Sequence, residues 1–146
     1  MLQACRLMWK GEGDIGPFTE LNNLTGAGPK LTEATFRAMM GAPTYRRELH
    51  LLVCAPDATL AAFCIIWHDD VNRMGLFEPV GCHPDHQRKG LATAMMREGL
   101  RRLQKLGSTQ ALVASSRRNQ ASNALYESLG FLSTGRKWYW TKTLRR

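Results

Sequence analysis

The sequence predicts a single domain, residues 1–146, of the mixed α/β (α+β) class, with helices flanking a mostly antiparallel sheet. Three strand-like stretches, 48–55, 59–68 and 74–80, follow one another through short turns, which is typical of an antiparallel meander. An amphipathic helical pattern over 91–106 then leads to a short apolar strand at 109–115. Because strand–helix–strand connections are right-handed crossovers, the third and fourth strands should be parallel.

The first 30 residues are the least informative part of the sequence. Residues 1–10 have the composition of a strand, but no periodicity selects that assignment, and residues 18–24 fit a short helical turn. Seven residues interrupt this stretch as loop formers: Gly11, Gly13, Gly16, Pro17, Gly26, Gly28 and Pro29. A clearer helix is predicted over 31–40, where Thr32 is a candidate N-cap and Pro43 prevents continuation.

Pro79 lies inside the third predicted strand, at 74–80. Proline lacks the N–H group that a central strand donates to its neighbour, so it requires an edge position or a bulge. A bulge would push the neighbouring strand away and leave backbone groups free for a ligand. We favour the bulge over a simple edge strand, because Pro79 directly precedes a loop with binding features.

That loop runs from Val80 to Ala92 and feeds the helix predicted over 91–106. The first N–H groups of a helix have no partner within it, and the helix dipole adds partial positive charge, so such a junction can bind an anion. Gly90 lets a ligand approach the backbone closely, and Arg88 and Lys89 add charge. The alternative is an ordinary turn whose small residues serve packing.

The last third of the chain predicts one more helix and a final strand or hairpin. Gly107 should end the helix over 91–106. Asn119 can cap a helix that runs to residue 129 and stops at Gly130. Residues 132–144 follow as a strand or hairpin with aromatic side chains.

Two motifs in this order resemble those of the GNAT superfamily of acyl-CoA N-acyltransferases. Gln87-x-x-Gly90-x-Ala92 is similar to its pyrophosphate loop, and the segment from Asn119 through Tyr126 to Phe131 is similar to its second signature. The resemblance covers residues 76–131 and weakens on both sides. It implies the GNAT fold, in which a splayed parallel strand pair holds the pantetheine arm of the cofactor.

The resemblance also implies the residues that bind acetyl-CoA as cosubstrate. The cofactor-binding residues are Val80, Gly81, Cys82, Gln87, Arg88, Lys89, Gly90, Leu91, Ala92, Asn119 and Tyr126. Backbone groups of the first three would grip the pantetheine and polarise the thioester carbonyl.

Two residues are candidates for acid–base catalysis. Tyr126 would protonate the departing thiolate, since a phenol with a pKa of roughly 10 suits that role; the alternative is a core aromatic. Glu78, if partly buried on a bulged strand, would be a base toward the amine; the alternative is a surface carboxylate. A covalent role for Cys82 is disfavoured because no activating partner is evident. His83 and His86 have no third metal ligand nearby, so no metal is expected.

We therefore expect an N-acetyltransferase that moves an acetyl group directly from acetyl-CoA to a primary amine of a small molecule or peptide. A non-catalytic CoA-binding or regulatory domain of the same fold is an alternative, and a basic nucleic-acid-binding module is a remote one. The acceptor and the oligomeric state, a homodimer included, are not specified by any motif.

Composition narrows these classes. The net charge of +8 suits an acidic partner such as the phosphates of CoA, and no base-reading motif favours nucleic acid. No apolar run approaches the roughly 20 residues that cross a membrane, and the N-terminus lacks the pattern of a signal peptide, so we expect a cytoplasmic protein. The four cysteines, Cys5, Cys54, Cys64 and Cys82, form no CxxC pair.

Overall fold

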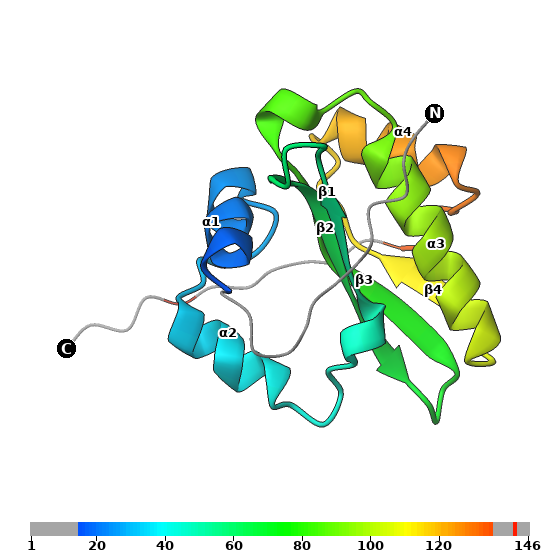
Figure 1. Ribbon diagram of the computed structural model, residues 1–146. Helices are drawn as coiled ribbons and strands as arrows, with labels where there is room; N and C mark the ends of the chain where they lie inside the picture. Colours follow the sequence, from blue (N-terminus) through cyan, green and yellow to red (C-terminus); the bar gives the residue numbers. More distant parts are fainter. Residues whose placement is uncertain (1–14, 136–141, 143–146) are drawn as a thin grey trace.

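The computed structural model describes residues 15–135 and Lys142, which form three layers. Helices α1 (Gly16–Thr25) and α2 (Glu33–Met40) lie on one face of a four-stranded sheet. Helices α3 (Leu91–Lys105) and α4 (Gln120–Ser128) lie on the other face (Figure 1). The strand expected over 1–10 and most of the one expected over 132–144 fall outside the described residues, and 132–135 form neither helix nor strand.

The sheet has the strand order β1-β2-β3-β4. Strands β1 (His50–Cys54), β2 (Leu60–Asp69) and β3 (Met74–Cys82) pair antiparallel, and β4 (Gln110–Val113) pairs parallel with β3. The predicted meander and the parallel crossover are therefore confirmed. The first strand starts later than expected, because a 3₁₀ turn, η1 (Arg47–Leu49), precedes it.

The two N-terminal helices begin where local chemistry favours it. Thr32 caps α2 as expected, and Thr35 reciprocates in a capping box. The interruption expected at Gly16 and Pro17 is wrong, because these residues begin α1. Proline is favoured in the first helical turn, where its missing N–H group would have no helical partner anyway.

The bulge expected at Pro79 is confirmed by the register of β2 and β3. Val80 lies opposite Cys64 and Phe77 lies opposite Ile66, so a single β2 residue opposes both Glu78 and Pro79. Pairing between β3 and β4 ends at Phe77, while β3 continues to Cys82. The parallel pair therefore diverges at the bulge, as expected.

A separate apolar core fills the space on each face of the sheet. The core toward α3 is centred on Ile66, Phe77, Met96 and Leu103, all almost fully buried. The core toward α1 and α2 is built from Phe18, Phe36, Phe63 and Ile65. Both cores pack against the segment of sheet that carries the bulge, so its position is set from both faces.

His50 is a titratable group inside the second core. Its ring centroid lies 4.6 Å from that of Phe18 and 5.7 Å from that of Phe36. The Tyr45 hydroxyl lies 2.9 Å from its Nδ1 atom. Burial lowers the pKa of His50 from 6.5 to about 4, so the folded protein holds this ring neutral.

We expect the free energy of unfolding to fall as the pH falls from 6.5 toward 4, because only the unfolded chain protonates His50 in that range. The lowered pKa corresponds to a contribution of roughly 3 kcal/mol to the free energy of unfolding. This contribution is complete above pH 6.5 and is lost as the pH falls toward the folded-state pKa of about 4. Urea denaturation of wild type and His50→Gln between pH 7 and 4 measures it, and the variant should lose this part of the dependence. Parallel pH curves for both proteins would contradict the expectation.

Candidate functional site

The loop from Cys82 to Gly90 carries β3 into α3 through a short 3₁₀ turn, η2 (Pro84–His86). Gly90 is the N-cap of α3 and adopts a left-handed backbone with φ of 75°. It has no side chain to bind the first N–H groups of the helix, so these groups are available to an anion. Arg88 is also left-handed, with φ of 62°, which is a loop shape typical of backbone anion sites.

Side chains of the loop divide into those that hold it and those that face solvent. The Lys89 ammonium group donates to the carbonyl oxygen of Asp85 at 2.9 Å, so it braces the loop. Gln87 and Arg88 are exposed, whereas Leu91 packs against the core beneath α3. The exposed residues surround the uncapped helix terminus that the sequence predicts as the pyrophosphate site.

Val80, Gly81 and Cys82 form the end of β3 beyond its pairing with β4. They pair only with β2 among the described strands, so the edge toward β4 is open for a ligand. Gly81 is small for a packing reason, because a Cβ atom there would lie 2.4 Å from Cε1 of Phe63. Its predicted contribution to cofactor binding therefore depends on its backbone.

Tyr126 lies on α4 and is partly buried against the core beneath α3. Its ring centroid lies 6.1 Å from that of Phe131. Burial raises the pKa of Tyr126, a hydrogen bond with Ser122 acts in the opposite direction, and the nearby Cys64 adds to the rise. Val80, at the open end of β3, packs against the same core as Tyr126. The raised pKa keeps the phenol protonated at neutral pH.

Asn119 is the N-cap of α4, as predicted. Its Oδ1 atom accepts a hydrogen bond from the Ser122 N–H group at 3.1 Å. Its Nδ2 group is therefore the part left to meet a ligand. Asn123 holds the preceding loop through longer contacts to the carbonyl oxygens of Ser116 and Arg117.

Glu78 belongs to the bulge, and its side chain is exposed. Of the two alternatives for Glu78, the structure therefore favours the surface carboxylate over the partly buried base, and the proposed role as a base depends on position alone. The carbonyl oxygen of Glu78 accepts a hydrogen bond from the indole of Trp67 at 2.7 Å.

Sequence reasoning did not identify Trp67 or Ser122 as part of the site. An aromatic residue within an apolar strand predicts core packing, so nothing signalled the contact between Trp67 and the bulge. Ser122 lies in the second motif, and its helical spacing of four residues from Tyr126 is a signal that could have linked the two.

Cys82 is chemically unsuited to act as a nucleophile. Burial raises the pKa of its thiol, and the charge of Lys89 offsets only part of this rise, so the thiolate is disfavoured. Among residues 15–135, no group of three or more His, Cys, Asp or Glu side chains is placed to hold a metal ion.

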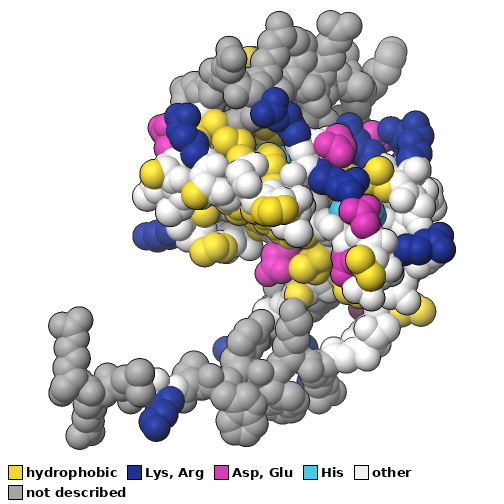
Figure 2. Space-filling view, turned by 90° about the horizontal axis from the view of Figure 1, so that it is seen from below, with side chains coloured by type: hydrophobic (Ala, Val, Ile, Leu, Met, Phe, Trp, Pro, Cys, Tyr) yellow, Lys and Arg dark blue, Asp and Glu magenta, His cyan; other side chains and the backbone are white. Residues whose placement is uncertain are grey.

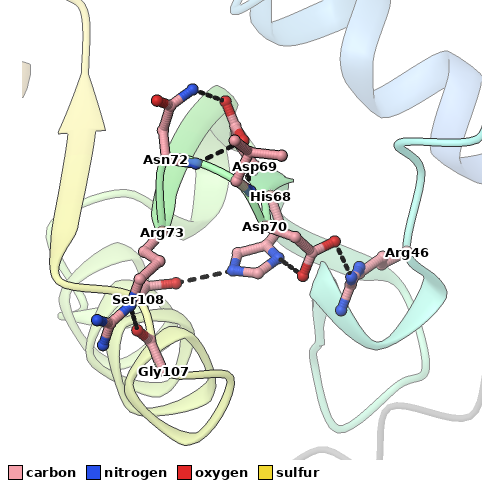
Figure 3. Close-up of polar contacts among 9 residues, drawn as sticks. Arg46, His68, Asp69, Asp70, Asn72, Arg73, Gly107 and Ser108 are labelled. Atoms are coloured by element: carbon pink, nitrogen blue, oxygen red, sulfur yellow. Dashed lines mark hydrogen bonds and ion pairs between the residues drawn. The ribbon is translucent and has the colours of Figure 1, made fainter.

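A second polar cluster joins Arg46, Asp70, His68 and Ser108 at the opposite end of β3 (Figure 3). Ser108 Oγ lies 2.9 Å from His68 Nε2, and Asp70 Oδ1 lies 3.2 Å from His68 Nδ1. The sequence of contacts from serine to histidine to aspartate resembles a hydrolytic triad. The exposure is unlike one, because the His68 side chain is 2% exposed and the Asp70 side chain 67%.

The backbone donors beside Ser108 are already used. The N–H group of Ser108 donates to Leu103 and that of Thr109 donates to Arg73, so neither can stabilise an oxyanion. The cluster therefore ties the β2–β3 turn to the turn after α3, where the Arg73 side chain also donates to Gly107 (Figure 3).

Positive charge is spread over the surface. Figure 2 shows Lys and Arg side chains distributed over the face seen from below, with hydrophobic side chains between them. On α3, Glu98 pairs with Arg101 at 2.6 Å and with Arg102 at 2.8 Å, which neutralises part of the basic helix. This distribution favours a solvated surface over one continuous nucleic-acid interface. Within the described part of the chain, no helix has the length and hydropathy to cross a membrane.

Comparisons with solved structures identify several similar folds. The ribosomal-protein-S18-alanine N-acetyltransferase from Escherichia coli is 27% identical, with 84% of this chain and 74% of that chain covered and a TM-score of 0.69. An aminoglycoside antibiotic 6'-N-acetyltransferase, AAC(6')-IG from Acinetobacter haemolyticus, is 24% identical over 92% and 95% of the two chains, with a TM-score of 0.69.

A third similar structure is AAC(6')-Iy in complex with the bisubstrate analog CoA-S-monomethyl-acetylneamine. It is 19% identical over 88% of this chain and 90% of that one, with a TM-score of 0.68. No curated protein matches the sequence significantly. The family model for the acetyltransferase (GNAT) family matches residues 20–131, well over half of the chain. The chain therefore belongs to the acetyltransferase (GNAT) family.

Proposed function

We propose that this protein transfers an acetyl group from acetyl-CoA directly to a primary amine of a small molecule or peptide. The observation that carries the proposal is the divergence of β3 from β4 beside the uncapped N-terminus of α3. It combines an open strand edge with an anion site at the end of the same strand. The similar AAC(6')-Iy fold, solved with a CoA-containing bisubstrate analog, supports acetyl-CoA as the cosubstrate.

In this proposal, the cofactor is held along β3 and the loop that follows it. The segment from Gln87 to Ala92 binds the pyrophosphate through backbone N–H groups and the positive end of α3. The open edge from Val80 to Cys82 pairs with the pantetheine arm, and the Asn119 amide contacts it from α4. Backbone donors at this edge also polarise the thioester carbonyl.

The chemical step is a single displacement at the thioester. The amine nitrogen attacks the carbonyl carbon, a C–N bond forms, and the C–S bond breaks. Glu78 takes the proton of the amine, directly or through a water molecule, and Tyr126 gives its proton to the departing CoA thiolate. The raised pKa of Tyr126 keeps this acid protonated before the reaction.

Acetyl-CoA should stabilise the folded protein, because it binds the native loop and has no site on the unfolded chain. At one hundred times its dissociation constant the gain should be roughly 2.7 kcal/mol. Thermal unfolding with and without acetyl-CoA measures this gain. An unchanged melting temperature at millimolar acetyl-CoA would contradict the cofactor assignment.

A matched pair of variants at Gly90 tests whether the loop carries the binding. Valine is a poor choice there, because φ of 75° strains a β-branched residue. Asparagine and aspartate tolerate this conformation and have nearly the same shape, and a Cβ atom at Gly90 would meet nothing within 4 Å. Gly90→Asp should lose most of the stabilisation by repelling the phosphates, and Gly90→Asn should keep more of it.

Turnover distinguishes an enzyme from a domain that only binds the cofactor. Acetyl-CoA is incubated with a panel of amines, peptides and aminoglycosides, and the released CoA thiol is measured with a thiol reagent. Thiol release that depends on one class of amine supports the transfer. Binding of acetyl-CoA without turnover on any amine would instead favour a non-catalytic domain.

A further inference from the structure

The bulge of β3 has a partner on β2 that the proposed transfer does not use. We propose that Trp67 is a positioning residue for acetyl transfer, which holds the Glu78–Pro79 bulge in the shape that the reaction needs. This inference rests on the proposed function. It assigns to Trp67 a role in the chemical step and none in cofactor binding.

The first argument concerns the backbone hydrogen bonds of the bulge. A carbonyl group in a regular strand is satisfied by the neighbouring strand, and a bulge interrupts that pairing. Here the carbonyl oxygen of Glu78 accepts from Nε1 of Trp67 at 2.7 Å, which is at the short end for an N–H donor. Trp67 lies opposite Leu76 in the register, so its side chain reaches along β3 to the bulge.

The second argument is that the indole itself is held in place. Trp67 packs against the core beneath α1 and α2, and its ring centroid lies 6.3 Å from that of Tyr45 in a T-shaped arrangement. A donor fixed by packing sets the direction of the carbonyl that it binds, and thereby the plane of the Glu78–Pro79 peptide group.

The third argument comes from the other side of the bulge. A Cβ atom at Gly28 would lie 3.3 Å from Cβ of Pro79, so the loop after α1 rests directly on the proline ring. Asn22 holds this loop by donating to the Pro29 carbonyl at 2.9 Å. This packing limits movement of the proline ring but does not orient the carbonyl group of Glu78. The hydrogen bond from the indole of Trp67 does orient it.

The bulge and the pyrophosphate loop are separate parts of the proposed site. Glu78, the proposed base, and Val80, at the start of the open edge, flank Pro79, whereas the cofactor phosphates would bind from Gln87 onward. A small rotation at the bulge would therefore misplace the reacting groups and leave most of the cofactor contacts intact. The expected signature is a lower kcat with an unchanged dissociation constant for acetyl-CoA.

The experiment compares Trp67→Phe with Tyr45→Phe in the full chain. Each change removes one hydrogen-bonding group from an aromatic residue of the same cluster, and Trp67→Phe also replaces the two-ring indole with a single ring. Only Trp67 contacts the bulge, because the Tyr45 hydroxyl bonds to His50. We expect Trp67→Phe to lower kcat by about tenfold, with the acetyl-CoA dissociation constant, measured by calorimetry, changed by less than about twofold. Tyr45→Phe should lower stability and leave kcat near that of wild type.

Several outcomes would overturn the inference. If Trp67→Phe has the kcat of wild type, Trp67 has no positioning role. If kcat falls equally in Trp67→Phe and Tyr45→Phe, the effect comes from core packing. Absence of turnover in the wild-type protein contradicts the proposed function itself, which is a different result from a failed variant. If Trp67→Phe does not fold, hydrogen exchange at the wild-type indole decides: an N–H that exchanges as fast as in free tryptophan overturns the hydrogen bond.

Discussion

Replacing Tyr126 with phenylalanine should lower the turnover number by about 10²- to 10⁴-fold, the range over which general acid–base groups usually contribute. The change removes the proposed proton donor to the CoA thiolate. The ring remains, so its packing against Phe131 and the core beneath α3 is kept. The affinity for acetyl-CoA should therefore change little.

The environment of Tyr126 sets the pH range of this effect. Burial raises its pKa above 10.0, so the hydroxyl is protonated at neutral pH and is lost as an acid only in strongly alkaline solution. Wild-type kcat should then show no loss from this group between pH 7 and 9. Replacing Ser122 with alanine removes a hydrogen bond that lowers this pKa, and should shift any alkaline limb to higher pH.

The measurement is pH-dependent turnover on the best amine from the screen, with calorimetric binding of acetyl-CoA beside it. Tyr45→Phe is the matched control, because it removes a hydroxyl from another partly buried tyrosine, on the opposite face of the sheet. A Tyr126→Phe enzyme with full turnover would reduce Tyr126 to a packing residue and leave the thiolate to be protonated by water.

Local chemistry made much of the fold predictable from the sequence. The meander, the crossover and the cap residues Thr32 and Asn119 follow from strand composition, helical periodicity and short polar side chains before helices. Pro79 also predicted the bulge, because a residue without an N–H group is tolerated in a sheet only at an edge or at a bulge. Gly16 and Pro17 were wrongly predicted to interrupt the chain as loop residues, because proline, which ends helices and strands, is also favoured in the first turn of a helix.

Contacts between distant segments were not predictable in this way. The indole of Trp67 on β2 reaches the bulge on the neighbouring strand β3, and His68 meets Ser108 from an element 40 residues away. Neither contact leaves a periodic or local signature, because each depends on how elements pack in space. The sequence left the burial of Glu78 open between a partly buried base and a surface carboxylate for the same reason: burial of a strand residue depends on the helices that cover it.

Replacing Gly99 with valine should lower the free energy of unfolding by about 3 kcal/mol or more, at the upper end of the cost of overpacking a core. Gly99 is a buried residue of α3 that faces strands β2 and β3 of the sheet. A Cβ atom there would lie 2.6 Å from Cδ1 of Ile66 and 2.7 Å from Cε1 of Phe77. Both side chains are about 1% exposed and have no free space to retreat into.

A glycine inside a helix costs about 1 kcal/mol relative to alanine, so its presence here needs a compensating gain. The close approach of α3 to the sheet supplies that gain. Gly99→Ala should therefore be less harmful than Gly99→Val, because better helix propensity offsets part of the clash. Ala94→Val on the exposed face of α3 is the matched control, and should change stability by less than about 1 kcal/mol.

Urea denaturation of the three variants and wild type measures these differences. Equal stability of Gly99→Val and Ala94→Val would show that the helix can move away from the sheet without cost.

The result also bears on the site, because Phe77 is the last β3 residue that pairs with β4 before the strands diverge. A helix pushed outward at Gly99 would release Phe77 and shift the point where the divergence begins. Acetyl-CoA affinity should then fall together with stability in Gly99→Val, and remain at the wild-type value in Ala94→Val.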